Sequence, residues 1–223
     1  FGACGGCAYQ TMSYESQLRF KEKQVKELMD VAVNNASKIM GDENNIIQYN
    51  YNGINPSPSY KEYRNKMEFS FGDEVKDGPL ALGLHKINSM HDIVSIKDCK
   101  LVSDDFNKII ECVLRFGTEH GYSFYKKMQH VGFLRHLLVR RSISDNSLLV
   151  AIVTTTKGEL DTKDMVDRLL SLKLDGKITG ILHIENDSKA DVVQSDKTHI
   201  LYMVISAIIT AGIMVLAFFF FFF

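Results

Sequence analysis

Two apolar runs, FLRHLLVRRS at 133–142 and SLLVAIVTTT at 147–156, constrain the fold more than any other part of this chain. Both are rich in aliphatic and β-branched residues, which are typical of strands. Asp145 and Asn146 lie between the runs and are favourable turn residues. We therefore expect a β-hairpin here and a fold that contains paired strands.

The rest of the chain alternates between strand-like and helix-like hydrophobic patterns. Strands are expected at 66–72, 79–86, 93–96, 133–142, 147–156 and 178–186. Helices are expected at 13–33, capped by Ser13, from Ser103 to a stop at Gly117, and at 161–172. This layout predicts an α+β fold, in which helices pack on an antiparallel or mixed sheet.

The composition is that of an ordinary globular protein, with 24% charged and 45% hydrophobic residues among 223. The formal net charge is −1, so the chain as a whole does not attract nucleic acid, and any such binding needs a local basic patch. Four cysteines in a chain of this length favour reduced or metal-bound thiols over a disulfide framework. We expect a cytoplasmic protein.

Cys4 and Cys7 form a C-G-G-C motif in which two glycines let the backbone wrap closely around a metal. Such a pair fits zinc, an iron–sulfur cluster or a redox pair, and buried cysteines without a metal remain an alternative. Cys99 is a third candidate ligand. Cys112 is expected to be an ordinary helix residue that lies off the apolar stripe.

Two basic clusters are candidates for binding phosphate beside aromatic residues that can stack a base. Tyr60 and Tyr63 accompany the first cluster. The candidate residues are Arg64 and Lys66 in the first cluster and Arg135, His136, Arg140 and Arg141 in the second. Solvated surface charge is the alternative explanation. His183 is expected to be a half-buried histidine with a satisfied hydrogen bond, and not a ligand.

Several segments, in order, resemble RNA uracil-5 methyltransferases that act on 23S ribosomal RNA. They are CGGCAYQTMSYESQLRFK at 4–21, SPSYKEYRNKMEFSF at 57–71, IVSIKDCKLV at 93–102, GFLRHLLVRRS at 132–142 and TGILHIENDSKADVVQSDKTHILY at 179–202. The resemblance runs from Phe1 to about Tyr202. It divides the chain into a partial iron–sulfur motif at 1–12 and the family's middle domain at 13–202.

The resemblance implies a [4Fe–4S] cluster with Cys4, Cys7 and Cys99 as three of its ligands, the first ligand being expected upstream of Phe1. It also implies that ribosomal RNA, and not DNA, is the partner. The parent enzyme would transfer a methyl group from S-adenosylmethionine to carbon 5 of uracil, during RNA methylation and rRNA processing. A cysteine thiolate would first add to carbon 6 of the base.

No residue of this chain matches the catalytic cysteine or the S-adenosylmethionine pocket of that family. We therefore expect the Rossmann-like methyltransferase half to be absent, the cofactor to belong to the full-length parent only, and this chain alone to be inactive. Residues 203–223, MVISAIITAGIMVLAFFFFFF, are expected to be a frameshift artefact or a transmembrane-like helix. Membrane association requires that this tail is genuine.

Two further interpretations stay open. The chain could be a non-catalytic metal- and RNA-binding module that works as written. It could also be a membrane-anchored cytosolic domain, which again requires a genuine tail.

Overall fold

The computed structural model describes residues 2–39, 48–189 and 196–204. The described helices are α1 (Tyr14–Ile39), α2 (Asp104–Glu119) and α3 (Thr162–Leu170). The strands are β1 (Lys66–Asp73), β2 (Leu80–His85), β3 (Ile93–Ser95), β4 (Leu134–Arg141), β5 (Ser147–Thr154), β6 (Lys177–Glu185) and β7 (Lys197–Met203). The strands form one sheet in the order β3-β2-β1-β4-β5-β6-β7.

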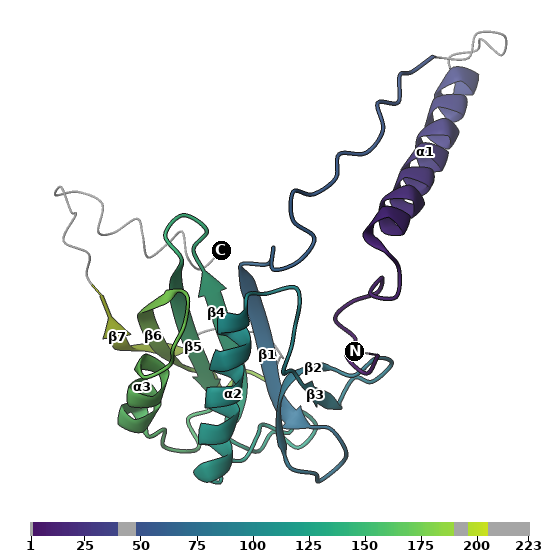
Figure 1. The fold of residues 1–223 in the computed structure, drawn as a ribbon. Helices are drawn as coiled ribbons and strands as arrows, with labels where there is room; N and C mark the ends of the chain where they lie inside the picture. Colours follow the sequence, from purple (N-terminus) through teal and green to yellow (C-terminus); the bar gives the residue numbers. More distant parts are fainter. Residues whose placement is uncertain (1, 40–47, 190–195, 205–223) are drawn as a thin grey trace.

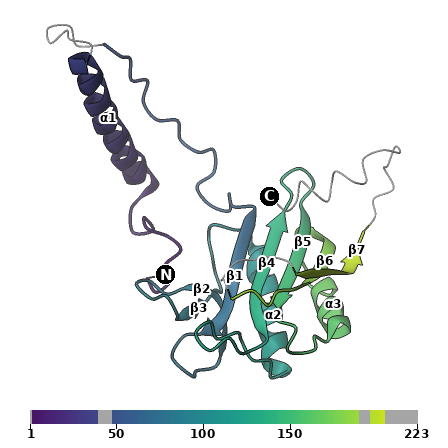
Figure 2. The ribbon, with the colours of Figure 1, turned by 180° about the vertical axis from the view of Figure 1, so that it is seen from behind.

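Helices α2 and α3 cover one face of the sheet, and the core lies between them and the strands (Figures 1 and 2). Of the apolar stripe predicted for α2, Phe106, Ile109, Ile110 and Val113 are buried there, and Leu114 is partly buried. The opposite face carries a smaller apolar cluster. That cluster consists of Leu138, Ala151, Val153, Leu182 and Ile184.

Two expectations about α2 are wrong. Cys112 does not lie off the apolar stripe: it is buried in the core, since it follows Ile109 by three positions and precedes Phe116 by four. Gly117 does not end the helix, which continues to Glu119. A Cβ atom at Gly117 would lie 3.0 Å from Leu80 Cδ2, so this glycine lets α2 pack closely on the sheet.

The predicted hairpins are confirmed, since β1 pairs with β2 and β4 with β5, both antiparallel. The predicted fold class, however, is wrong. All strands join one continuous sheet, and β5 and β6 are parallel and connected through α3. A parallel pair joined by a crossover helix is the β-α-β unit from which Rossmann-like folds are built. This unit contradicts the expectation that the Rossmann-like methyltransferase half is absent.

Strand β7 was missed by the sequence analysis. It pairs antiparallel with β6 at the edge of the sheet, where His199 lies opposite His183. Its residues are half-buried or exposed, so its hydrophobic pattern is weak. Residues 190–195, just before this strand, lie outside the described residues.

Helix α1 begins after Ser13, whose hydroxyl accepts a hydrogen bond from the amide of Ser16 at 3.2 Å, as expected for an N-cap. It runs to Ile39, six residues beyond the predicted end. Its apolar side chains Val25, Leu28 and Met29 are exposed, Leu28 at 71%. Figure 1 shows why: α1 projects away from the sheet and is accompanied by the coil that follows it.

The predicted tail at 203–223 lies outside the described residues except for Met203 and Val204. Within the described ranges, no helix is both long and apolar enough to cross a membrane. The domain boundaries expected at residues 12 and 202 stay predictions.

Candidate functional site

The C-G-G-C turn lies against the end of β2. The amide of Gly5 donates to the carbonyl of His85 at 2.9 Å, and the amide of Ile87 donates to the carbonyl of Ala3 at 2.8 Å. A Cβ atom at Gly6 would stand 2.8 Å from Leu84 Cδ1, so a larger residue here would displace the Leu84 side chain. The turn is therefore fixed to the sheet although it is one of the first segments of the chain.

Cys99 lies at the same edge of the sheet, because it follows β3, which pairs with β2. Its amide donates to Asn107 Oδ1 of α2 at 3.0 Å, which ties this segment to the core. The amide of Gly6 points to Cys4 Sγ at 3.4 Å, a contact that stabilises a thiolate. We call the segments around Cys4, Cys7 and Cys99 the cysteine edge.

The thiols of the cysteine edge are free and half-buried, whereas Cys112 is buried and its burial raises the pKa of its thiol above the ordinary value. The sulfur atoms of Cys4, Cys7 and Cys99 do not all lie within 4.8 Å of one another. Ligands of one zinc ion would need such proximity, but cluster thiolates bind different irons and stand farther apart. The three thiols therefore do not form a ready-made mononuclear zinc site in this structure.

Four of the six predicted RNA-binding residues come together at one end of β1 and β4. Lys66 of β1 lies directly opposite Arg140 of β4. The amide of Arg141 donates to the carbonyl of Asn65 at 2.8 Å, and the amide of Arg64 donates to that of Leu101 at 2.9 Å. We call Arg64, Lys66, Arg140 and Arg141 the basic cluster.

Exposed aromatic rings lie in the segment that leads into β1. Tyr60 and Tyr63 are each 57% exposed. Tyr60 stacks on Tyr14 with ring centroids 5.2 Å apart. Cations beside accessible aromatic rings are the combination by which proteins bind single-stranded RNA, since the cations contact phosphates and the rings stack on bases.

Arg135 lies elsewhere and is only 2% exposed. Its Nη1 donates to the carbonyl of Asn186 at 2.8 Å and to that of Ser188 at 2.7 Å, and its guanidinium lies 4.3 Å from the ring centroid of Tyr125. The side chain therefore ties the segment after β6 to the sheet. An RNA contact by Arg135 would require this network to open.

His136 is also buried, with Nδ1 3.4 Å from Ser70 Oγ. The charge pattern of the sequence did not show that this end of β4 is covered. The register of the β4–β5 ladder also shifts here, between Leu134 and His136. The predicted second cluster is thus divided between a buried end and an accessible end of β4.

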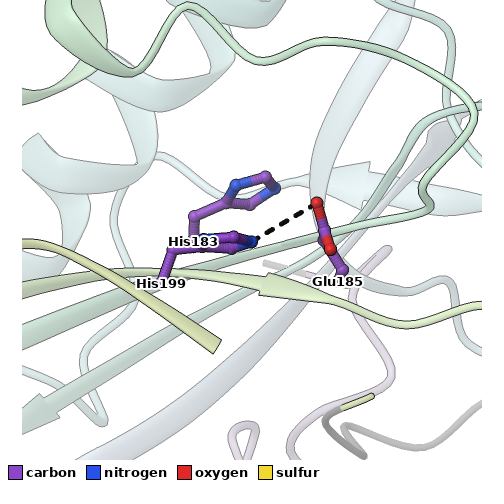
Figure 3. Close-up of side chains that lie close together, drawn as sticks. All are labelled: His183, Glu185 and His199. Carbon is purple, nitrogen blue, oxygen red and sulfur yellow. Dashed lines mark ion pairs between the residues drawn. The ribbon is translucent and has the colours of Figure 1, made fainter. Parts of the chain in front are cut away.

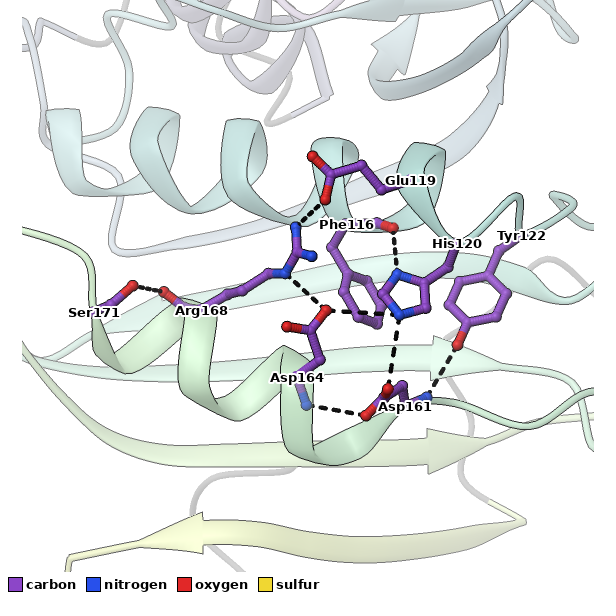
Figure 4. A network of polar contacts seen from close by, with 8 residues as sticks. All are labelled: Phe116, Glu119, His120, Tyr122, Asp161, Asp164, Arg168 and Ser171. Atoms are coloured by element: carbon purple, nitrogen blue, oxygen red, sulfur yellow. Dashed lines mark hydrogen bonds and ion pairs between the residues drawn. The ribbon is translucent and has the colours of Figure 1, made fainter.

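A polar network that the sequence did not reveal fastens α3 to α2 (Figure 4). Arg168 Nε donates to Asp164 Oδ2 at 2.8 Å, and its Nη1 donates to Glu119 of α2. The bond from Arg168 holds the pKa of the Asp164 carboxyl below its ordinary value. His120 Nε2 lies 3.6 Å from the same carboxylate. The network positions the crossover helix of the β5-α3-β6 unit.

The comparisons with known proteins agree with the resemblance read from the sequence. No family model matches the chain. It is 43% identical over 197 residues to an uncharacterized RNA methyltransferase of Clostridium acetobutylicum, covering 88% of this chain. Uncharacterized RNA methyltransferases of Clostridium tetani and Caldanaerobacter subterraneus subsp. tengcongensis are 38% and 37% identical, each over 91% of this chain.

The architecture is similar to that of a solved methyltransferase. The crystal structure of Pyrococcus abyssi tRNA (uracil-54, C5)-methyltransferase in complex with S-adenosyl-L-homocysteine matches with a TM-score of 0.59 at 24% identity. The match covers 88% of this chain and 40% of that chain. Because it places nearly all of this chain within a methyltransferase architecture, it too contradicts the predicted fold class.

In sequence, the chain is similar over about nine tenths of its length to proteins named RNA methyltransferases. In fold, it is similar to a solved tRNA (uracil-54, C5)-methyltransferase, in agreement with the resemblance seen in the sequence. The chain spans about two fifths of the length of the curated relatives it matches, between 41% and 42%.

Proposed function

We propose that this chain is the iron–sulfur and RNA-contacting part of an S-adenosylmethionine-dependent methyltransferase that modifies carbon 5 of uracil in 23S ribosomal RNA. The observation that carries the proposal is the identity of 37–43% to RNA methyltransferases over about nine tenths of the chain. The protein would act in the cytoplasm, and at a membrane only if the tail at 203–223 is translated.

The basic cluster supplies the RNA contact in this proposal. Arg64, Lys66, Arg140 and Arg141 would neutralise phosphates, while Tyr60 and Tyr63 would stack on unpaired bases. The structure supports this role because the four cations are gathered at one end of β1 and β4 with accessible aromatic rings nearby. Arg135 and His136 are given no RNA contact, since they are buried.

The cysteine edge would hold the [4Fe–4S] cluster. Cys4, Cys7 and Cys99 provide three soft thiolate ligands at one edge of the sheet, and the Gly6 amide is positioned to donate to a bound sulfur. When bound, such a cluster supplies either a redox centre or a rigid crosslink between the first residues of the chain and β3. The sequence at the edge supports binding and leaves both roles open.

Catalysis is assigned to no described residue of this chain. S-adenosylmethionine is proposed as the methyl donor because the solved tRNA methyltransferase was crystallised with S-adenosyl-L-homocysteine, the demethylated product. That this chain alone lacks activity stays a prediction.

The proposal is tested by RNA selectivity. The full chain, purified without oxygen and reconstituted with iron and sulfide, is titrated against a uridine-containing stem-loop of 23S ribosomal RNA, a tRNA transcript and a DNA duplex of equal length. The same mixtures are incubated with S-adenosylmethionine and digested, and 5-methyluridine is measured by mass spectrometry.

Binding of the ribosomal stem-loop at least about tenfold tighter than the DNA, a difference of about 1.4 kcal/mol, supports the proposal. Preference for the tRNA would overturn the ribosomal assignment while leaving the family assignment intact. Equal affinity for RNA and DNA would contradict the proposed RNA-contact role. Formation of 5-methyluridine would show that the predicted inactivity is wrong.

A further inference from the structure

Three side chains of types that can bind a metal lie on β6 and β7, at the edge of the sheet opposite the cysteine edge. His183 and Glu185 are two positions apart on β6 and therefore point to the same face. His199 of β7 lies directly opposite His183 in the antiparallel ladder. Strand geometry alone thus brings two imidazoles and a carboxylate together.

The ligand atoms of these three residues all lie within 4.8 Å of one another. His199 Nε2 is 3.5 Å from Glu185 Oε1, and the two imidazole rings are stacked with centroids 5.6 Å apart. Figure 3 shows the carboxylate beside the edges of both rings. Small rotations of the three side chains would bring their donor atoms to the 2.0–2.2 Å that zinc requires.

The electrostatic setting also suits a cation. His183 is only 8% exposed, and burial lowers the pKa of its imidazole below the ordinary value, so the neutral, metal-binding form is favoured. Glu185 supplies a negative charge. His199 Nε2 is shielded from solvent and makes no hydrogen bond within the described part of the chain, only the ionic contact with Glu185.

Thr154 of β5 fixes the orientation of the buried imidazole. Its Oγ1 lies 2.8 Å from His183 Nε2 and donates to the carbonyl of Thr155 at 3.0 Å. Metal-binding histidines commonly have their rings held by such a neighbouring polar group. The hydrogen bond expected for His183 from the sequence is therefore present, and the surroundings add a coordinating role that the sequence did not predict.

We propose that His183, Glu185 and His199 bind a single zinc ion that fastens edge strand β7 to β6. Two imidazole nitrogens and one carboxylate oxygen form a donor set that zinc accepts, with a fourth position left for water. The donors do not suit Mg²⁺ or Ca²⁺, which prefer all-oxygen sites. This site is independent of the cysteine edge and of the proposed RNA contact.

Cysteine thiolates can also bind zinc, so the test uses a chain in which the three thiols of the cysteine edge are replaced. The full chain carrying Cys4→Ser, Cys7→Ser and Cys99→Ser is stripped with a chelator and titrated with Zn²⁺ alone by calorimetry, and with Co²⁺ alone in the visible range. The variants His199→Asn and Glu185→Gln are compared in that background. His91→Asn removes an exposed histidine outside the group and is the matched control.

We expect one Zn²⁺ per chain, visible Co²⁺ absorption typical of four-coordinate nitrogen and oxygen ligands, and a higher Tm with Zn²⁺. His199→Asn and Glu185→Gln should each weaken Zn²⁺ binding at least about tenfold, while His91→Asn leaves it unchanged. Circular dichroism checks that each variant is folded. If His199→Asn does not fold, Glu185→Gln still tests the proposal, because this substitution preserves the size of the side chain.

Absence of Zn²⁺ binding by the folded chain would overturn the proposal, leaving the group as an ion pair only. Binding of equal strength in Glu185→Gln and His199→Asn would also overturn it, because the metal would then be held elsewhere. Neither result bears on RNA affinity, so a failure here is distinguishable from a failure of the proposed function.

Discussion

Lys66 and Arg140 face each other at one register position of the antiparallel β1–β4 ladder, so two cations project from the same face of the sheet. Like charges placed directly opposite weaken a strand pair. The carboxylate of Glu68 partly offsets this repulsion, because its Oε1 lies 2.8 Å from the Lys66 ammonium. An RNA phosphate would relieve the remaining repulsion, and this relationship motivates the first prediction.

The double variant Lys66→Gln, Arg140→Gln should bind RNA more weakly and with a shallower salt dependence. If each cation neutralises one phosphate, the slope of log K against log salt should fall by about 0.7 for each cation removed, on single-stranded RNA. Anisotropy titrations from low to moderate salt measure this slope. Lys163→Gln, on α3, is the control and should leave it unchanged; an unchanged slope in the double variant would remove these residues from the interface.

Arg135→Met should destabilise the fold because it removes the hydrogen bonds that the guanidinium donates to the carbonyls of Asn186 and Ser188. Losing a hydrogen bond from a charged donor costs about 1.5–3 kcal/mol, so we expect a loss of about 2–4 kcal/mol in the free energy of unfolding. Urea denaturation provides the measurement. Arg141→Met should cost less than about 1 kcal/mol, and equal losses in the two variants would contradict the structural role of Arg135.

Adjacent aspartates at the start of α2 should behave differently. Asp105 is 1% exposed and accepts hydrogen bonds from the amides of Asp175 and Gly176, both at 2.8 Å. Asp105→Ala should lower the free energy of unfolding by about 2–3 kcal/mol, since both amides lose their acceptor. Asp104 pairs at the surface with Lys108, and Asp104→Ala should change stability little. The prediction fails if the two substitutions cost the same.

The four cysteines should separate by reactivity. Burial raises the pKa of Cys112, and the thiolate is the reactive form, so the metal-free folded chain should react rapidly with a thiol reagent only at Cys4, Cys7 and Cys99. Mass spectrometry after timed labelling identifies the modified residues, and the fourth thiol should appear on unfolding. Rapid labelling of Cys112 in the native protein would contradict its place in the core.

Asp187 should contribute pH-dependent stability. The hydroxyl of Thr156 donates to its carboxylate at 2.6 Å, and this bond, with the Thr156 amide, holds the pKa of Asp187 below its ordinary value. Because the folded pKa is lowered, the stabilisation is complete above the unfolded value near 3.8 and is lost as the pH falls through the folded value. The stability difference between the native chain and Asp187→Asn should therefore narrow below about pH 4. A constant difference from about pH 3 to 7 would contradict this assignment.

The sequence was most informative where hydrophobic periodicity and turn residues agreed. The β4–β5 hairpin and the apolar stripe of α2 follow from local pattern, and the structure confirms both. The parallel direction of β5 and β6 does not follow from local pattern, because it depends on where α3 packs after it crosses the sheet. Strand β7 escaped notice because an edge strand is only half covered and shows little alternation.

The candidate sites, too, could be predicted from the sequence only in part. Cys4 and Cys7 were found from their spacing, and the fold adds that Cys99 reaches the same sheet edge. Charge alone could not separate Arg135, which is enclosed by the segment after β6, from Arg140, which lies at the accessible end of the strand. The grouping of His183 with His199 depends on the register of β6 and β7, which no short motif records.

The strand order has a consequence for cooperativity. Among the described strands, sheet neighbours are also successive in the chain except at one seam, where β1 meets β4. The sheet therefore consists of two consecutive-strand units, β1–β3 with the cysteine edge and β4–β7 with the histidine group. One hydrophobic core spans the seam between them, so we expect the two units to open together in native-state hydrogen exchange. Lys66 belongs to one unit and Arg140 to the other, so the basic cluster exists only while the seam is closed.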